Sequence, residues 1–586
     1  MPGFASLRRT PGLKFQDVEG VMRLVRVAVI SVTAGLFLSC DGSEYFSGPL
    51  TSESCSTGGR THSGSVPSGT WRRGASPHVL VDSVVVDSTL TIEPGSLVCG
   101  MPGSTLTVAG LEAVGTEDSP IVFTSDDPDG WGGLRGRGLL RNARIERTVF
   151  AVRGPFEIDR SVILRTRSWA VTPWWHGDGQ QVILRDVVID SACTAGGCGA
   201  VLVQPFSGAT LEDVVIRWSG GDGILAGYEY CGLTIDGGSI EGSAGVGLRM
   251  VVLKPFRACG FSLIEPVRIT GGAEHPAIVT AGAALHFLRD AETQAALAGN
   301  ALDELIVTGD HDFGDADLTL TRQLPVSVGF SCGHFRGALV RLGMITMEPG
   351  ASLALFSCDF GVHLRANGTA EEPVTIRGGA ARLHTIAGHA DTAYLRHVVF
   401  RDHIVLRADS APVILEDITL HDSSFELVAA GSRIDGIDAV RSNGIRPYGF
   451  GPGPDPWPTL ILHSGTSLRN AHIEQSLGDG IVVDGDDVSI DGCTITTSAQ
   501  HGIRVLAGAP VVRSCNIVAN AGDGIHNAGS GQVDAVLNWW GDAMGPLGPD
   551  GDGVHGNILY DPFLAGPAAG AGGGKDADRN LLTRRR

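Results

Sequence analysis

The chain has 586 residues, of which 83 are glycine and only 6% are aromatic, and its formal net charge is −20 at pH 7. Its three lysines, Lys14, Lys254 and Lys575, leave no basic stripe along a phosphate backbone, which argues against nucleic-acid binding, and polyanionic sugars would be repelled unless a metal ion bridged them. Short runs of Val, Ile and Leu broken by Gly, Asp and Asn favour many brief strands joined by tight turns.

The N-terminal region carries the features of an export signal. From Met22 the text MRLVRVAVISVTAGLFLSC places Arg23 and Arg26 before an apolar run of signal-peptide length, too short to span a bilayer comfortably. FLSC, which ends at Cys40, resembles the bacterial lipobox, in which the cysteine is lipidated. The resemblance implies a signal peptide over residues 1–40 with Met22 as the true start, and a lipid anchor on Cys40 in the cell envelope, at the outer membrane or the cell surface. The alternative is a plain secretory signal with an incidental cysteine, which implies a secreted protein.

Two segments lack any apolar period. Residues 41–77 are rich in Ser, Gly and Thr and predict a flexible tether. Residues 566–586 predict a disordered tail. The body between them divides into a first segment at 78–300 and a second at 301–565.

A six-residue unit recurs along the body with the form apolar, polar, Asp/Asn/Gly, apolar, any, apolar. Its copies begin at residues 140 (LRNARI), 158 (IDRSVI), 184 (LRDVVI), 211 (LEDVVI), 235 (IDGGSI), 395 (LRHVVF), 415 (LEDITL), 468 (LRNAHI), 490 (IDGCTI) and 512 (VRSCNI). A second unit, in which Gly precedes an apolar residue, recurs at Gly223, Gly247, Gly480, Gly502 and Gly524. The last copies of both units are 22 residues apart.

This step predicts an all-β chain wound as a parallel β-solenoid with several short strands per coil. Coils stack about 4.8 Å apart and share one core, because no coil can bury its apolar face alone. The third position of the hexamer is expected at a bend with left-handed backbone angles, which Asp, Asn and Gly tolerate. The fourth and sixth positions are expected to face the core.

The repeat resembles the right-handed parallel β-helix proteins of the pectate-lyase-like superfamily over residues 78–565. Entry motifs of the type LTIEPG…GTEDSPIVFTS (90–125) resemble its bacterial extracellular branch, and ITMEPGASL…GTAEEPVTI repeats them from residue 345, which predicts an internal duplication. One helix is expected from AGAALHF (281) to Gly299, and the Pro-rich text RPYGFGPGPDPWPT (446–459) predicts an extruded loop. The resemblance is specific for the fold and leaves the activity open.

Ten cysteines follow Cys40, an even number, and disulfides are expected in an exported chain. The candidate pairs are Cys493 with Cys515, Cys231 with Cys259, and Cys332 with Cys358. The first pair occupies the fourth hexamer position one coil apart, which suits a disulfide that faces the core. Stacked buried thiols are the alternative for all three pairs. No C-x-x-C pair occurs, so no zinc site is predicted.

The C-terminal text NWWGDAMGPLGPDGDGVHGNILYDPFL resembles the closing motif of many bacterial β-helices. A solenoid leaves its last coil with a bare apolar cross-section and unpaired edges that must be covered by a cap. Neighbouring strand residues face opposite ways, so one of Trp539 and Trp540 is expected over the final coil and the other outside it. The alternative is that the two rings form a sugar-stacking platform.

Outward positions of a stacked sheet form columns, and the superfamily resemblance implies that substrates bind on such columns. Asp479, His501 and Asp523 directly precede turn glycines, and Arg504 lies two residues after one of them. The two aspartates are then two coils apart, about 9.6 Å between backbones, which approaches the carboxyl separation of inverting glycosidases. These four residues are the candidate catalytic set, in which Arg504 can hold a substrate carboxylate. The alternative is structural, since Asp is an ordinary residue before a turn glycine.

Other functional sets are incomplete. Asp486 and Asp487 lack the Gly-His-Gly and Arg-Ile-Lys companions of the polygalacturonases. Asp126, Asp127 and Asp129 in SDDPDGWGG can bind calcium, although a polar loop is the simpler interpretation, and no other cofactor is predicted. A role like that of β-helix proteins in periplasmic copper maturation predicts clustered His and Met, whereas the 18 histidines are scattered along the sequence and Met is scarce.

These features predict a monomeric, exported, lipid-anchored and non-catalytic β-helix with a structural, adhesive or glycan-binding role. Its expected partner is a polysaccharide or cell-surface glycan, and it contacts the membrane through the lipid anchor alone. The alternative is a polysaccharide lyase or glycoside hydrolase centred on Asp479, His501, Asp523 and Arg504.

Overall fold

The computed structural model describes residues 55, 58–173, 180–227, 231–251, 260–309, 317–330, 340–356, 359–379, 381–385, 392–442 and 457–571. The predicted signal peptide with Cys40, and the Pro-rich loop up to residue 456, lie outside these residues. Among the helices in the described part of the chain, none is long and apolar enough to cross a membrane.

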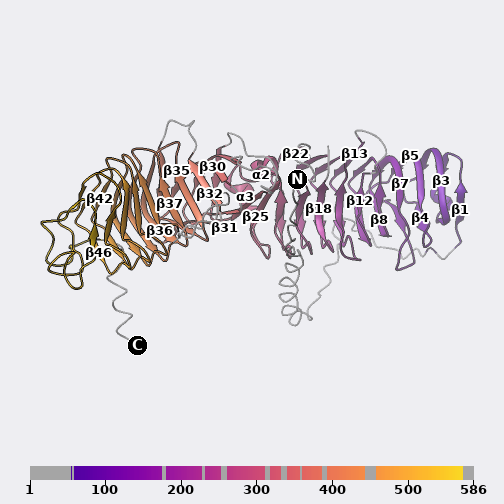
Figure 1. Cartoon of the computed structure of the whole chain (residues 1–586). Helices are drawn as coiled ribbons and strands as arrows, with labels where there is room; N and C mark the ends of the chain where they lie inside the picture. The colour runs from indigo at the N-terminus through magenta and orange to yellow at the C-terminus, as the bar shows by residue number, and fades with distance from the viewer. Residues whose placement is uncertain are drawn as a thin grey trace, which may run out of the picture. The chain divides into compact units, whose positions relative to one another are not determined.

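Most coils contribute two or three strands, which pair in parallel with strands of the neighbouring coils (Figure 1). In one coil these are β16 (Ser207–Glu212), β17 (Val215–Arg217) and β18 (Asp222–Gly227), and in the next they are β19 (Gly232–Asp236), β20 (Ser239–Glu241) and β21 (Leu248–Val251). β16 pairs with β19, β17 with β20, and β18 with β21. The step of 22 residues is confirmed near the C-terminus, where Ile490 pairs with Val512. The fold is a right-handed parallel β-solenoid of about 19 turns, as predicted.

The bend inside the hexamer is left-handed at every copy. The third residue of all ten units has a positive φ, namely Asn142, Arg160, Asp186, Asp213, Gly237, His397, Asp417, Asn470, Gly492 and Ser514. Two of these, Arg160 and Ser514, are not residues that favour this conformation, so the stack imposes it on them. It does so through bonds between coils: the Ser514 N–H donates to the carbonyl of Leu537 at 3.1 Å.

A second left-handed bend follows the hexamer and was not predicted. It lies two residues beyond the last hexamer position, at Arg147, Arg165, Ser191, Trp218, Asp402, Asp422, Gln475, Thr497 and Ala519, and at Gly242. Nine of these ten residues are not glycine, so the sequence carries no composition signal for the bend. The two bends together close each coil into three sides.

We expect Ser514→Gly to raise the free energy of unfolding by about 1 kcal/mol, because glycine relieves a left-handed strain of roughly 1–2 kcal/mol while it adds less in chain entropy. Ser489→Gly is the matched control. Ser489 lies within β42 (Ser489–Asp491), where glycine should cost about 0.5–1 kcal/mol. Denaturant unfolding of the two variants would measure both changes in free energy. A loss of stability in both variants would contradict the inference that the left-handed backbone at Ser514 is strained.

The core is continuous along the solenoid. The fourth and sixth hexamer positions are buried, as at Ala143 and Ile145, or at Val398 and Phe400. One cluster of buried side chains extends from Trp71 to Trp540. The predicted inward positions are therefore confirmed.

Two short helices, rather than the one predicted, interrupt the coils. They are α2 (Ala281–Phe287) and α3 (Ala291–Ala295), which Figure 1 shows between the coils labelled β18 and β30. Asp290 separates them because its carboxylate accepts from the Thr293 N–H and starts a new helix. One row of strands passes the helices unbroken, since β24 (Ala277–Val279) pairs with β25 (Leu305–Gly309). The two predicted segments therefore form one hydrogen-bonded solenoid.

The helices shift the strand pattern by one side of the coil. β18 holds the glycine unit GDGILA, and its row continues through β24 and β25 to β34 (Val398–Arg401) and β43 (Thr494–Thr496). These last two strands hold the second half of the hexamers LRHVVF and IDGCTI. The glycine units at Gly223 and Gly480 therefore lie on different rows.

The C-terminal half of the predicted tether is ordered, so that prediction is wrong for residues 60–71. β1 (Arg60–Ser65) and β2 (Gly69–Trp71) pair with β3 (His78–Ile92), and the turn η1 (Arg73–Ala75) follows β2. Their inward side chains are His62 and Trp71, whose rings stack at 4.3 Å. Because these side chains are not aliphatic, the alternation of aliphatic and polar residues that marks a strand in the sequence is missing here. Burial lowers the pKa of His62 to about 4, and the ring stays neutral inside this first coil.

The C-terminal cap is confirmed. Trp540 is 0% exposed and belongs to the core, whereas Trp539 is half-buried and its N–H donates to the carbonyl of Cys515. Beyond it the chain returns through β49 (Val554–His555) and β50 (Ile558–Leu559), which pair with β47 (Ile525–Asn527) and β48 (Val533–Asp534). The fully buried ring of Trp540 argues against a sugar platform made of both rings.

The predicted tail is ordered at its start. The Ala568 N–H donates to Asn516 Oδ1 at 2.8 Å, and Thr494 Oγ1 donates to the carbonyl of Ala571 at 3.1 Å. Residues 566–571 therefore pack on the last coils, and residues 572–586 lie outside the described part of the chain.

Candidate functional site

All four candidate residues lie on one row of strands or in the turns that precede these strands. The row consists of β32 (Ala381–Thr385), β35 (Ile404–Ala408), β37 (Ser424–Leu427), β39 (Leu460–His463), β41 (Ile481–Asp484), β44 (Ile503–Ala507), β47 and β49. In-register pairing aligns one outward position on each strand: His384, Arg407, Glu426, Ile461, Val482, Arg504, His526 and His555. We call this alignment the outer column.

Asp479 does not face outward as expected, and its side chain is only 5% exposed. Its Oδ1 accepts a hydrogen bond from the His501 N–H on the next coil at 3.0 Å. Its Oδ2 lies 3.8 Å from Arg504 Nη1. Both oxygens are therefore used between coils, and a buried carboxylate with these partners has no free face for a substrate.

The same arrangement occurs in the first half of the chain, on a different row. Asp222 also precedes a turn glycine, and its Oδ1 accepts from the Val246 N–H on the next coil at 2.9 Å. Arg249 Nε, on that next coil, donates to Asp222 Oδ2 at 2.8 Å. The recurrence of an aspartate that caps the next turn and pairs with an arginine supports the structural interpretation of Asp479 and Arg504.

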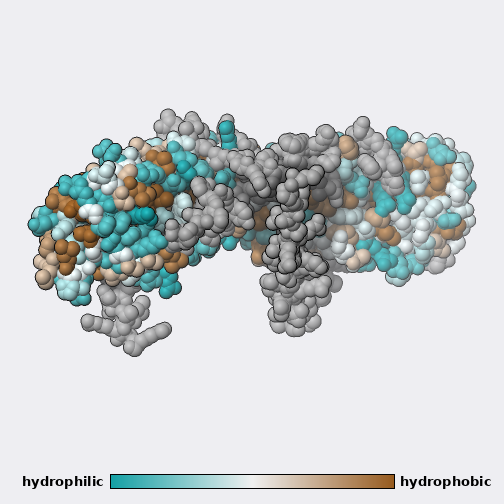
Figure 2. Space-filling model, in the orientation of Figure 1, coloured by the Kyte–Doolittle hydropathy of each residue, from teal (hydrophilic) through white to brown (hydrophobic). Residues whose placement is uncertain are grey.

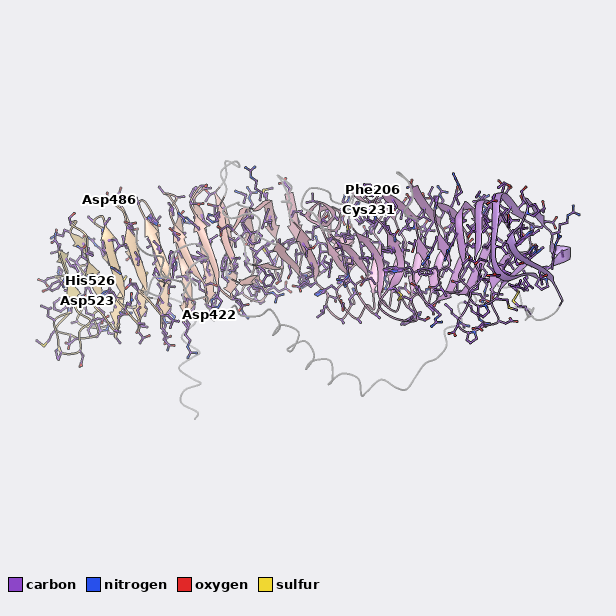
Figure 3. The ribbon with its side chains drawn as sticks, turned by 45° about the vertical axis from the view of Figure 1, so that its right-hand side comes forward. Phe206, Cys231, Asp422, Asp486, Asp523 and His526 are labelled. Carbon is purple, nitrogen blue, oxygen red and sulfur yellow. A yellow bond between two sulfur atoms is a disulfide. The ribbon has the colours of Figure 1, made fainter. Side chains whose placement is uncertain are left out.

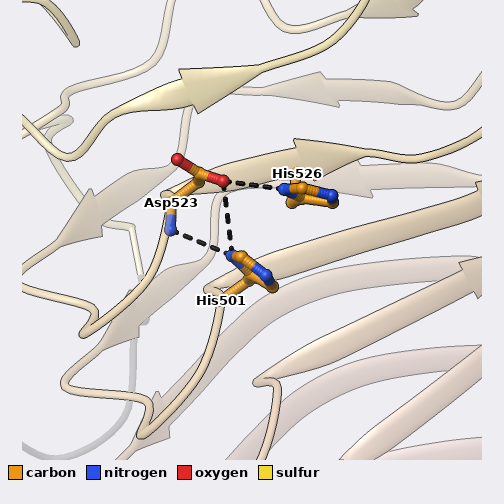
Figure 4. A group of neighbouring side chains, drawn as sticks. All are labelled: His501, Asp523 and His526. Carbon is orange, nitrogen blue, oxygen red and sulfur yellow. Dashed lines mark hydrogen bonds and ion pairs between the residues drawn. The ribbon is translucent and has the colours of Figure 1, made fainter.

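Asp523 differs from these two aspartates because a histidine replaces the arginine. His526 Nδ1 lies 2.8 Å from Asp523 Oδ2, and His501 Nδ1 lies 3.5 Å from the same oxygen (Figure 4). The Asp523 N–H donates to His501 Nδ1 at 2.9 Å. His501, Asp523 and His526 are all partly exposed. Asp486, the acidic residue compared above with the polygalacturonases, lies well away from Asp523 and His526 (Figure 3).

Stacked imidazole rings extend this cluster. The ring centroids of His501 and His526 are 4.4 Å apart, and those of His526 and His555 are 4.7 Å apart with only 5° between the planes. Burial holds the pKa of His501 below its ordinary value, although Asp479 and Asp523 act in the opposite direction. His501 is therefore neutral at pH 7. His501, His526 and His555, which are 22 or more residues apart in the sequence, are stacked in the structure.

A second polar group on the same row was missed by sequence reasoning. Arg407 Nε lies 3.7 Å from Glu426 Oε2, and His463 Nε2 lies 3.6 Å from Glu426 Oε1. His463 Nδ1 in turn lies 3.7 Å from Asp484 Oδ2. The Glu426 side chain is only 14% exposed, so it lies in a recess between Arg407 and His463. The sequence signal, a polar residue at an outward position of consecutive strands, becomes visible only once the register is known.

The recess contains polar atoms without a hydrogen bond. Arg407 Nε and His463 Nε2 are buried atoms that have no hydrogen-bond partner in the described part of the chain, although Arg407 Nε also lies 3.6 Å from Asp409 Oδ2. His384 Nε2, on the strand that pairs with that of Arg407, is a third such atom. Buried donors of this kind are rare and are often satisfied by water or a ligand. Glu426 raises the pKa of His463, and Asp484 adds to the effect, so the ring tends to be protonated and to donate through both nitrogens.

The predicted disulfide between Cys493 and Cys515 is wrong, because both cysteines are free and buried. The Cys493 N–H instead donates to Cys515 Sγ at 3.3 Å, so the two thiols form a ladder in the core, which was the alternative. Burial raises the pKa of Cys515 well above its ordinary value, which keeps the thiol neutral. Cys231 lies in a disulfide, and its predicted partner Cys259 falls outside the described residues.

Two disulfides within the described residues were not predicted. Cys55 bonds to Cys99 and Cys193 bonds to Cys198. The first joins residues 44 apart, a spacing that no single coil suggests. The predicted pair Cys332 and Cys358 lies outside the described part of the chain.

The aspartates proposed for calcium form a polar turn. The Asp129 N–H donates to Asp127 Oδ1 at 2.7 Å, and Asp129 Oδ1 pairs with Arg167 at 2.8 Å. Of the His, Cys, Asp and Glu side chains in the described ranges, one set of three brings its ligand atoms within 4.8 Å of one another, and it is His501, Asp523 and His526.

Comparison with known proteins supports the fold. A family model described as a right handed beta helix region matches residues 460–538, which include β41, β44 and β47. No curated protein matches the chain. The stacked parallel coils and the family match together define a right-handed parallel β-helix protein.

Proposed function

We propose that this β-helix is an exported surface protein that binds a linear glycan along the outer column without cleaving it. The observation that carries the proposal is the polar cluster around Glu426, in which nitrogens of Arg407 and His463 lie 3.7 and 3.6 Å from the carboxylate and have no hydrogen-bond partner among the described residues. Sugar hydroxyl groups accept and donate hydrogen bonds, and they can satisfy such donors.

The composition of the outer column suits a polymer that carries both hydroxyl and C–H surfaces. Ile461 is partly exposed and lies between Glu426 and Val482 in register. The charged residues around Glu426 are therefore followed in the outer column by two aliphatic residues. Figure 2 shows hydrophilic and hydrophobic side chains intermixed over the C-terminal coils. Repeated coils about 4.8 Å apart offer one contact per coil to an extended chain.

The second candidate function is polysaccharide cleavage, and one observation favours it. Glu426 and Asp484 contact opposite nitrogens of His463, which gives a recessed carboxylate, a second carboxylate and a titratable ring in one place. The earlier candidate set is disfavoured for this role because both oxygens of Asp479 are engaged between coils.

Screening the purified protein against a panel of polysaccharides separates the two functions. We expect saturable binding without new reducing ends or unsaturated uronides. Arg407→Ala should weaken binding roughly 10- to 150-fold, the equivalent of a lost charge-assisted hydrogen bond. Arg469→Ala, which removes an exposed arginine from another row, is the control. Turnover that disappears in Glu426→Gln would establish the enzyme instead.

The anchor belongs to the same proposal and is tested separately. Cys40 follows an apolar run of signal-peptide length in the sequence FLSC, which supports lipidation in the envelope of a bacterium. Cys40→Ala should abolish metabolic palmitate labelling and release the body in soluble form. A wild-type protein without lipid would show instead that it is secreted freely.

A further inference from the structure

We propose that His501, Asp523 and His526 form a binding site for a divalent transition-metal ion such as Zn²⁺ or Ni²⁺. One ligand atom from each residue lies within 4.8 Å of the others. The Nδ1 atoms of the two histidines approach one oxygen, Asp523 Oδ2, at 3.5 Å from His501 and 2.8 Å from His526 (Figure 4). The site lies at the turns of successive coils, and its His526 also belongs to the outer column, although metal binding requires no glycan.

The donor set fits this class of metal. Two imidazole nitrogens and one carboxylate are ligands of Zn²⁺ and its neighbours, at about 2.0–2.2 Å, which places tetrahedral ligand atoms about 3.4 Å apart. The contact between His501 and Asp523 already has this length. The shorter contact between His526 and Asp523 must open by about 0.6 Å, and the Asp523 side chain is 32% exposed and free to move by that amount. Calcium is a poor fit because it requires six to eight oxygen ligands.

The protonation state prepares two of the three ligands. The Asp523 N–H donates to His501 Nδ1, which therefore carries a lone pair and no proton. His526 Nδ1 shares a proton with Asp523 Oδ2 in the metal-free protein. A bound ion takes the place of that proton, the neutral ring carries its proton on Nε2 instead, and the ion displaces the backbone N–H from His501 Nδ1. The displaced bond is one net hydrogen bond, a small cost beside metal coordination.

The surroundings limit the number of protein ligands to three. Arg504 pairs in register with His526, and its positive charge opposes a cation, although Asp479 lies 3.8 Å from Arg504 and offsets that charge. His555 stacks on His526 at 4.7 Å, and it is not part of the set whose ligand atoms all lie within 4.8 Å of one another. Since His501, Asp523 and His526 are all partly exposed, water or a ligand can complete the coordination shell, as at open metal sites.

The test is titration of the purified metal-free protein with ZnCl2 by calorimetry, with the bound metal counted by elemental analysis. We expect one ion per chain and at least tenfold weaker binding in His526→Ala and in Asp523→Asn. His421→Ala, which removes an exposed histidine outside the cluster, is the matched control and should bind as the parent does.

Co²⁺ provides a readout that does not depend on affinity, because its visible absorption reports tetrahedral nitrogen and oxygen ligands. The spectrum should appear with the parent and His421→Ala, and it should be lost in His526→Ala. His501→Gln is a second variant, since a glutamine keeps a hydrogen-bond acceptor for the Asp523 N–H and preserves the turn. Absence of saturable binding, or binding that survives in both His526→Ala and His501→Gln, would overturn the site.

Discussion

Trp540→Ala is expected to lower the free energy of unfolding of the C-terminal coils by about 3–5 kcal/mol, the cost of removing a large buried aromatic side chain. Trp540 is 0% exposed and ends the core cluster, so its loss leaves a cavity at the last coil. Solenoid stability depends on contacts between neighbouring coils, and an uncovered end frays first.

Hydrogen exchange locates this effect along the chain. Amide protons in residues 512–540 should exchange faster in Trp540→Ala, whereas the coils before residue 300 should keep the rates of the parent. Trp539→Ala is the matched control, since that ring is half-buried and its contribution to the ladder is made by the backbone N–H. Equal exchange in both variants, combined with lost glycan affinity, would show that the pair binds sugar and does not close the core.

Asp479→Ala is expected to lower the free energy of unfolding by about 2–3 kcal/mol in metal-free buffer. The substitution leaves the His501 N–H without its acceptor and Arg504 without its nearby carboxylate, and both penalties arise in partly buried positions. Denaturant unfolding measures the loss, and Asp222→Ala should show a similar loss in the first half because the same contacts recur there.

The matched control for this prediction is Asp523→Ala. The Asp523 side chain is 32% exposed, so its removal should cost less than 1 kcal/mol. A catalytic Asp479 makes the opposite prediction: Asp479→Ala would abolish turnover of a polysaccharide and leave the unfolding free energy close to that of the parent. The two interpretations are therefore separated by one pair of measurements.

The sequence by itself determined the solenoid, because its information is local and periodic. A residue such as Asp417 or Asn470 at the third hexamer position tolerates a left-handed bend, and apolar residues at the fourth and sixth positions must be buried together with those of the next coil. The cap followed for the same reason, since an open end with two adjacent tryptophans can bury only one of them on a strand.

The tertiary structure alone decided the functional surface. Asp479 and Asp523 occupy equivalent positions before a turn glycine, yet one is buried against Arg504 and the other is open beside two histidines. The difference comes from the partners of each carboxylate: Asp479 contacts His501 and Arg504 of the next coil, whereas Asp523 contacts His526 of its own coil and His501 of the preceding coil. Contacts across a stack depend on register, and register is set by every turn and insertion along the chain.

The helical insert illustrates this dependence. α2 and α3 move the strand pattern by one side of the coil, so the glycine unit at Gly223 and the one at Gly480 lie on different rows. The recess around Glu426 and the stack of His501 and His526 are likewise products of alignment between coils about 4.8 Å apart. Their contacting members lie from 19 residues (Arg407 and Glu426) to 37 residues (Glu426 and His463) apart in the sequence, where nothing marks them as neighbours until the coils are in register.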